Sequence, residues 1–286
     1  MNGASAATPW VLLRGLTRER RHWGTFPQTF SAAMPGARVI ALDLPGNGAL
    51  HHEHSPWRVE AMAQHCRRQL QDLGVPPRYR VLAMSLGAMV ATCWAASHPE
   101  EVSAAVLINT SLRPFSPFHH RLRPRNYARL LRLMLSHPTD DDWEQAVLHL
   151  TSGAPQRHAG VVEAWAAYRR ECPVTRSNAL RQLWAAARWS APVARPAVPL
   201  LLLTSAADGL VDTLCSLRLA QHWPCGIATH PWAGHDLPLD DGPWVAAQVR
   251  DWLACMPAGM PAASRSPGEP VAPYSPPATR APGHPP

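Results

Sequence analysis

The segment Val81-Leu-Ala-Met-Ser85-Leu-Gly87 joins a stretch with the composition of a β-strand to a stretch with the apolar spacing of a helix. Small residues, Ala83 and Gly87, lie two positions before and two positions after Ser85. A strand-to-helix turn that is tight enough to expose a serine leaves no room for large side chains at these two positions. The segment therefore has the pattern of a nucleophile elbow, with Ala83 where the usual form has glycine. The alternative interpretation is a serine that only caps the helix 86–97.

Apolar runs and amphipathic stretches alternate on both sides of this turn. The apolar runs have the length and composition of strands, and the amphipathic stretches have helical spacing. Strands are predicted at 10–13, 38–42, 79–83, 104–109, 200–204 and 227–230. Helices are predicted at 59–73, 86–97, 213–222 and 243–253. Because strands that alternate with helices form βαβ units, the sequence predicts an α/β fold, with a mostly parallel sheet of about six strands flanked by helices.

The alternation stops between Ser111 and Pro199, where only helical patterns occur, at 125–136, 141–150, 161–170 and 177–188. We expect an inserted all-helical cap at residues 112–198, between two parts of one core at 9–111 and 199–255. Residues 1–8 and the Pro/Ala-rich tail 256–286 are expected to be disordered, the tail because its proline and small polar residues can bury little apolar surface.

Composition excludes several classes of protein. The 286 residues are 46% hydrophobic, which rules out a wholly disordered chain. All 27 basic residues are arginine, so chemistry that needs a lysine amine is excluded. The net charge of +7 is not gathered into a block, and we therefore expect no nucleic-acid partner. No apolar run is long enough for a membrane span, and the six cysteines lack metal-site spacing, so we expect a cytoplasmic protein without metal or cofactor.

Two further candidate residues follow predicted strands. Asp208 comes after the strand 200–204, and His235 comes after the strand 227–230. The chain order Ser85, Asp208, His235 is the order in which α/β-hydrolases place the nucleophile, the acid and the base, each at the carboxyl end of a different strand. Asp212 is the alternative acid, and Asp208 is favoured because it follows its strand directly.

These motifs resemble those of the α/β-hydrolases, in particular serine esterases and lyases with a helical cap, over residues 10–253. Leu13-Arg14-Gly15-Leu16 lies at the place of that family's His-Gly oxyanion turn, and Asp43-Leu-Pro-Gly-Asn-Gly48 lies at the place of its Asp-x-Pro-Gly-x-Gly loop. The acid and histidine segments are similar to those of the carboxylesterases that demethylate pimeloyl-acyl-carrier protein, a family that also has a four-helix cap. The chain lacks residues for the family's two extra N-terminal strands, which implies a six-stranded sheet.

The resemblance implies a serine hydrolase that cleaves a carboxylic ester or thioester through an acyl-enzyme on Ser85. The backbone N–H groups of Leu16 and Leu86 would form the oxyanion hole. A lyase, a C–C hydrolase or an acyltransferase could use the same residues, and a non-catalytic binding protein is a further alternative, because Arg14 and Ala83 depart from the family pattern.

Other polar residues have less specific interpretations. Arg14, Arg123 and Arg125 are candidate substrate-binding residues for an anionic handle or for an acyl-carrier protein, and solvated helix faces are the alternative. Asp43 is expected to bond to the backbone of its Pro-Gly turn. Two further groups of residues are expected in solvated loops: Asp236, Asp240 and Asp241, and His51-His52-Glu53-His54. A metal site is the alternative for the histidine group.

Overall fold

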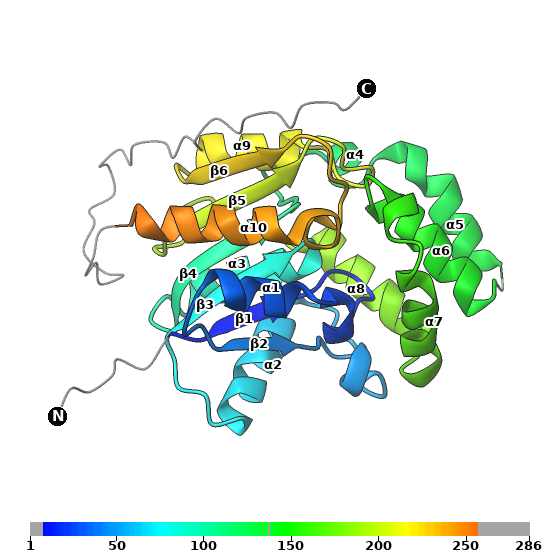
Figure 1. Cartoon of the computed structure of the whole chain (residues 1–286), viewed down its shortest axis with the longest axis horizontal. Helices are drawn as coiled ribbons and strands as arrows, with labels where there is room; N and C mark the ends of the chain where they lie inside the picture. Colours follow the sequence, from blue (N-terminus) through cyan, green and yellow to red (C-terminus); the bar gives the residue numbers. More distant parts are fainter. Residues whose placement is uncertain (1–7, 137, 257–286) are drawn as a thin grey trace.

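Six parallel strands form one sheet in the order β2-β1-β3-β4-β5-β6 (Figure 1). The computed structural model describes residues 8–136 and 138–256. The segments that are expected to be disordered, 1–8 and 256–286, lie outside the described residues except for Thr8 and Met256. Each predicted strand overlaps an observed strand, and the predicted fold class is confirmed. The strands are β1 (Trp10–Leu13), β2 (Val39–Leu42), β3 (Tyr79–Met84), β4 (Val102–Ile108), β5 (Leu200–Ser205) and β6 (Gly226–His230).

Helices cover both faces of the sheet, which explains why its strands are continuous apolar runs. Helices α2 (Val59–Asp72), α3 (Leu86–Ser97) and α9 (Leu214–His222) lie on one face, and α1 (Phe26–Ala33) and α10 (Leu237–Ala254) lie on the other. Strand β1 shows the alternation: Val11 and Leu13 pack into the core under α2 and α3, whereas Trp10 and Leu12 pack under α1 and α10.

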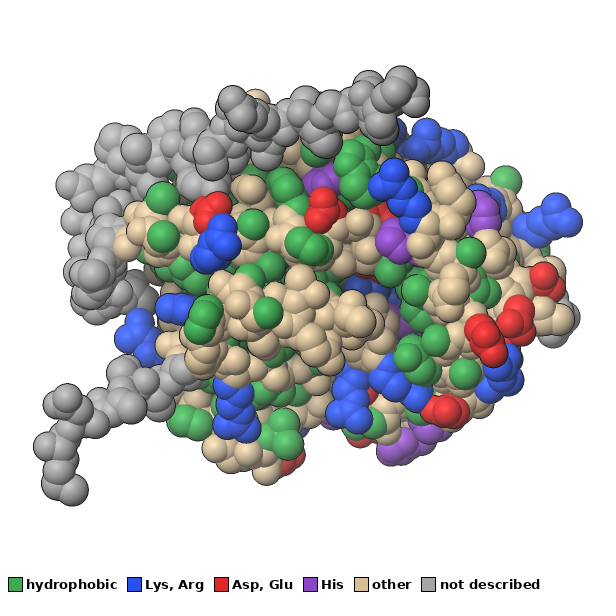
Figure 2. Space-filling model, viewed as in Figure 1, with side chains coloured by type: hydrophobic (Ala, Val, Ile, Leu, Met, Phe, Trp, Pro, Cys, Tyr) green, Lys and Arg blue, Asp and Glu red, His purple; other side chains and the backbone are tan. Residues whose placement is uncertain are grey.

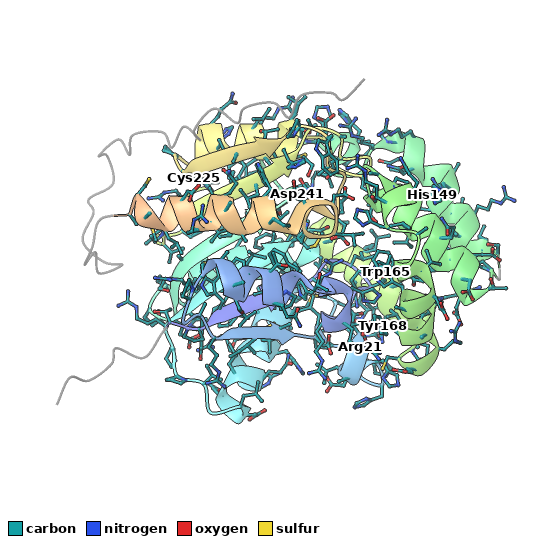
Figure 3. All side chains as sticks on the ribbon, in the orientation of Figure 1. Arg21, His149, Trp165, Tyr168, Cys225 and Asp241 are labelled. Atoms are coloured by element: carbon teal, nitrogen blue, oxygen red, sulfur yellow. The ribbon has the colours of Figure 1, made fainter. Side chains whose placement is uncertain are left out.

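Two helices differ from the prediction. Helix α1 was not predicted, although Phe26 and Phe30 lie one helical turn apart and pack together, with the Phe30 ring 4.9 Å from that of Trp10. The predicted helix 243–253 corresponds to the main part of α10, and α10 also includes an earlier turn that begins at Leu237. A kink at Asp241, labelled in Figure 3, interrupts α10 two residues before Pro243.

The segment between β4 and β5 is helical, as predicted. It holds the four expected helices, α5 (Tyr127–Leu135), α6 (Asp140–Thr151), α7 (Val161–Glu171) and α8 (Arg176–Arg188), and a single turn that was not predicted, α4 (Phe118–Arg121). Figure 1 shows α5, α6 and α7 together at one end of the molecule. We refer to residues 112–198 as the cap.

Helix α5 packs loosely on the rest of the cap. None of its residues is buried, and the side chains of Leu131 and Leu135 are 57% and 69% exposed. In Figure 2 arginine side chains lie at several separate places on the visible face rather than in one block. No helix within residues 8–136 and 138–256 is both long enough and apolar enough to span a membrane.

Candidate active site

Ser85 lies at a strained turn between β3 and α3. Its φ of 53° and ψ of −119° put a residue with a side chain in a region that L-residues rarely adopt. A hydrogen bond to strand β4 fixes this turn, because Ser85 N–H donates to the carbonyl of Ile108 at 3.0 Å. The side chain is partly exposed and makes no capping hydrogen bond to α3, so the helix-cap alternative is wrong.

The turn after β1 approaches the elbow so closely that there is no room for a side chain at Gly87 and little room for one at Gly15. A methyl group on Gly15 would come within 3.1 Å of Ser85 Cβ and 3.6 Å of its Oγ. A methyl group on Gly87 would lie 2.5 Å from the carbonyl oxygen of Arg14 and 2.6 Å from that of Leu13. The glycine two positions after the serine therefore has a direct steric cause.

The two backbone groups predicted for the oxyanion hole lie on these touching segments. Leu86 is the first residue of α3, and the first N–H groups of a helix have no intrahelical acceptor. Leu16 precedes Thr17, whose φ is 57° and whose N–H donates to Oε1 of Gln182 at 2.8 Å. Gln182 is fully buried on α8, so the cap itself fixes the backbone next to Leu16. Gln182 was not predicted, because it contacts a residue 165 positions away in the sequence.

Asp208 and His235 form a buried hydrogen-bonded pair at the ends of β5 and β6. Nδ1 of His235 donates to Oδ2 of Asp208 at 2.7 Å, since an ionised carboxylate can only accept. Oδ1 of Asp208 accepts from the N–H groups of Leu210 at 2.8 Å and Val211 at 2.9 Å, which fixes the carboxylate. Burial lowers the pKa of His235, but the Asp208 carboxylate outweighs burial and the pKa is raised. With its proton on Nδ1, the neutral ring has an unprotonated Nε2 that can accept one.

The structure also separates the two candidate acids. Asp212 accepts from Leu214 N–H at 3.0 Å and lies 3.8 Å from Nη2 of Arg123. Its carboxylate therefore bonds the backbone at the start of α9. Asp208, and not Asp212, contacts His235.

Asn109 connects the loop of the histidine to the serine side of the sheet. Its side chain donates to the carbonyl of His235 at 2.8 Å and to Ser205 Oγ at 3.0 Å, and it accepts from Ser205 N–H at 2.9 Å. Asn109 directly follows Ile108, whose carbonyl accepts the hydrogen bond from Ser85 N–H. Its φ of 45° is tolerated because asparagine adopts left-handed backbone more readily than most residues.

Asp240 bonds the histidine loop to the cap, and its predicted place in a solvated loop is wrong. Its buried carboxylate accepts from Gly234 N–H at 2.6 Å, from Gly153 N–H at 2.7 Å and from Ser152 Oγ at 2.5 Å. The backbones meet here without space for side chains, because a methyl group on Gly234 would lie 2.5 Å from the nitrogen of Gly153. The end of α6 and the histidine loop thus form one bonded unit.

Asp236 and Arg14 correct two further predictions. Asp236 was expected in a solvated loop and Arg14 at the substrate, but the two side chains form a bidentate ion pair and each is only 3% exposed. Burial raises the pKa of Asp236, and the Arg14 guanidinium reverses this effect, so the pKa lies below its ordinary value. Arg14 is therefore held by the protein and is not available to bind an anionic substrate.

The two cap arginines lie against the acid loop. Arg123 N–H donates to the carbonyl of Leu210 at 2.8 Å, and Arg125 reaches the carbonyl of Gly209 at 3.4 Å. Both residues are thus close in space to Asp208, and substrate binding by them stays a prediction.

A buried polar cluster fixes the cap to the segment that follows the oxyanion turn. Arg18 donates to Glu144 of α6 at 2.6 Å, and its guanidinium lies 4.5 Å from the ring centre of Trp165 on α7. Arg21 stacks on Tyr168 at 4.3 Å, and Figure 3 shows these two residues side by side below Trp165. These contacts attach α6 and α7 to the core.

The other polar candidates serve structural roles. Asp43 accepts from Ala49 N–H at 3.1 Å, at the end of its Pro-Gly turn, which confirms the prediction. Among the residues that the structure describes, the one group of three metal-type ligands within 4.8 Å is His98, Glu100 and Glu101, and Glu101 is ion-paired to Arg67. Residues 51–54 form no such group, and the metal alternative for them is not supported.

Comparison with known proteins agrees with this architecture. The family model described as alpha/beta hydrolase fold matches residues 9–240. The biotin biosynthesis bifunctional protein BioHC of Teredinibacter turnerae is 31% identical over 102 residues, which are 35% of this chain and only 17% of that protein.

Solved structures also resemble this chain. An esterase from Thermogutta terrifontis shares 20% identity, with 87% of this chain and 90% of that chain covered and a TM-score of 0.67. The 2-hydroxy-6-oxo-6-phenylhexa-2,4-dienoate hydrolase of Rhodococcus sp. strain RHA1 shares 16% identity, with 87% and 91% covered and a TM-score of 0.70. At these identities the likeness shows the fold alone.

Proposed function

The chain belongs to the alpha/beta hydrolase fold family, and we propose that it is a serine hydrolase that cleaves a carboxylic ester or thioester. The observation that carries the proposal is the 2.7 Å bond between the buried His235 and Asp208, at the same sheet edge as the strained, partly exposed Ser85. A nucleophile, a base and an acid that orients the base are the three parts that acyl transfer through serine needs.

In the acylation step, Ser85 Oγ attacks the carbonyl carbon of the substrate while Nε2 of His235 takes the hydroxyl proton. Asp208 keeps the other ring proton on Nδ1 and stabilises the imidazolium that forms. The negative charge that develops on the carbonyl oxygen is stabilised by hydrogen bonds that the N–H groups of Leu16 and Leu86 donate. The imidazolium then gives its proton to the leaving alcohol or thiol, and an acyl ester remains on Ser85.

In the deacylation step, water attacks the acyl ester with His235 again as general base. The proton returns to Ser85 Oγ as the carboxylic acid leaves. Serine at the elbow favours this chemistry over reactions that need a carboxylate nucleophile, such as the opening of an epoxide.

The substrate class is part of the proposal. The acid and histidine segments resemble those of carboxylesterases that demethylate pimeloyl-acyl-carrier protein, and the relative BioHC is named for biotin biosynthesis, so an acyl ester carried on an acyl-carrier protein is the substrate to test beside small esters. Arg123 and Arg125, beside the acid loop, would face the anionic part of such a substrate. All six cysteines are free thiols, which supports the cytoplasm as the compartment.

The test is covalent labelling of the purified protein with a fluorophosphonate, read by intact mass. We expect one adduct per chain, lost in Ser85→Ala and kept in the matched control Ser97→Ala, which removes an exposed serine from the far end of α3. A p-nitrophenyl ester series and an acyl-carrier thioester then define the acyl chain, and incorporation of oxygen from labelled water into the acid separates hydrolysis from lyase or transferase chemistry.

Labelling that persists in Ser85→Ala would show that another residue is the nucleophile. A folded protein that never labels would contradict the assignment and favour a binding role, to be tested by association with an acyl-carrier protein.

A further inference from the structure

The ion pair between Arg14 and Asp236 joins two loops that are far apart in the sequence. Nη1 of Arg14 donates to Oδ1 of Asp236 at 3.0 Å and Nη2 donates to Oδ2 at 2.6 Å, across 222 positions of the chain. The guanidinium also lies 4.8 Å from the ring centre of Trp23. A bidentate pair fixes orientation as well as distance, because the planar fork of arginine matches both carboxylate oxygens.

Each partner is adjacent in sequence to a part of the candidate active site. Arg14 immediately precedes Gly15, the residue that touches Ser85, and lies two positions before Leu16. Asp236 immediately follows His235. A shift of either partner is therefore transmitted through one or two peptide units to the oxyanion turn or to the base.

The pair also contributes to the electrostatic field at the imidazole. The charged groups that act on His235 come from three segments: Asp208 after β5, Asp236 in its own loop and Arg14 after β1. Asp236 raises the pKa of His235 and Arg14 lowers it, so the two partners act in opposite directions. Removal of one partner disturbs both the position and the charge balance of the base.

We propose that Arg14 and Asp236 are a positioning pair, which holds the His235 imidazole and the Leu16 N–H in register around Ser85. The pair acts through its neighbours and does not touch the substrate. This inference rests on the proposed function, because it says how the base and the oxyanion turn of that same site are held in position.

The first test measures the rate of phosphonylation of Ser85 and the kinetic constants for a small ester in Asp236→Asn and Arg14→Gln. We expect each variant to lose about 10- to 100-fold in labelling rate and kcat with little change in KM, because a misplacement of about 1 Å has an effect of this size. The matched controls are Asp251→Asn and Arg250→Gln, which remove an exposed ion pair of α10 and should behave like the wild type.

The pH profile separates positioning from a general loss of structure. Activity needs neutral His235, so the acidic limb of kcat/KM follows its pKa. Loss of the negative charge in Asp236→Asn should move this limb to lower pH, and loss of the positive charge in Arg14→Gln should move it to higher pH. Arg14→Lys keeps the charge and loses the fork, so it should keep the wild-type limb with a reduced rate.

The double variant Arg14→Met with Asp236→Leu removes both buried charges and keeps the experiment informative if a single variant does not fold. We expect a folded protein that labels slowly. Wild-type labelling rates and pH profiles in these variants would overturn the proposal. If the wild type itself does not label at Ser85, the proposed function fails, and NMR titration of the His235 ring still tests the pair: unchanged titration in both single variants overturns it.

Discussion

Gly87→Ala tests the close approach between the elbow and the oxyanion turn. The added methyl group would lie 2.5 Å from the carbonyl oxygen of Arg14 and 2.6 Å from that of Leu13, and both obstacles are backbone atoms. Ordinary van der Waals contact begins at 3.4 Å, so the two segments must separate by about 0.9 Å. Side-chain rotation cannot relieve the overlap, and the turn that contains Leu16 has to move.

The size of the effect follows from two opposing contributions. Overpacking of a rigid site destabilises by about 1–3 kcal/mol, and the backbone obstacles put this site at the upper end. Alanine inside a helix is favoured over glycine by about 1 kcal/mol, which offsets part of the loss. We expect Gly87→Ala to be about 2 kcal/mol less stable than the wild type, with a Tm lower by about 4–8 °C. A turn displaced by about 1 Å should also reduce kcat/KM by about 100-fold.

The assays are urea unfolding followed by circular dichroism and the kinetics of the best p-nitrophenyl ester. Gly160→Ala is the matched control, because a methyl group there would meet nothing within 4 Å. Its stability should stay within about 0.5 kcal/mol of the wild type, and its activity should not change. If Gly87→Ala matches the wild type in both stability and kcat/KM, the argument that Gly87 permits the contact is refuted.

Three further predictions concern the buried charges. Asp208→Asn should keep the fold and lower kcat by about 10⁴-fold, because the imidazole loses its orienting carboxylate; near-native turnover would assign the acid elsewhere. Since the pKa of His235 is raised above its ordinary 6.5, kcat/KM should decline as pH falls through a value above 6.5, and a limb well below 6 in a pH–rate profile would contradict this. Arg14→Met should destabilise by about 3–5 kcal/mol at pH 7, because it leaves the Asp236 carboxylate buried and unpaired. The wild type loses the contribution of Asp236 only as pH falls from 3.8 through its lowered pKa, whereas burial raises that pKa in the variant, so the measured difference in unfolding free energy should shrink as pH falls from 7 towards 3.8.

The fold was largely predictable from the sequence because the sheet is covered on both faces. Burial on two sides requires continuous apolar runs such as Val81 to Met84, and these stand out between helices. Helix α1 escaped notice because it has only eight residues and a proline at its start. Pro243 marked the part of α10 that follows the kink at Asp241, and the short turn from Leu237 before the kink was not predicted.

The site was predictable where local backbone geometry dictates the residue. Ser85 and Gly87 carry a steric signature, and Asp208 and His235 lie in the loops that follow β5 and β6. The identity of a distant partner has no such signature: Asp236 pairs with a residue 222 positions away, and its burial could not be inferred from a loop rich in aspartate. Asp240 was misassigned for the same reason, since its three donors come from two different loops.

The cap consists of two parts that are attached to the core with different firmness. Asp240 bonds the end of α6 to the loop of His235, so a backbone change near Gly153 is transmitted to that loop. Helix α5 has no buried residue, and its Arg129 donates to the carbonyl of Ala146 on α6 at a longer 3.3 Å. Substitutions on α5 are therefore expected to cost little stability. A library of cap variants should randomise α5 and leave the end of α6 unchanged.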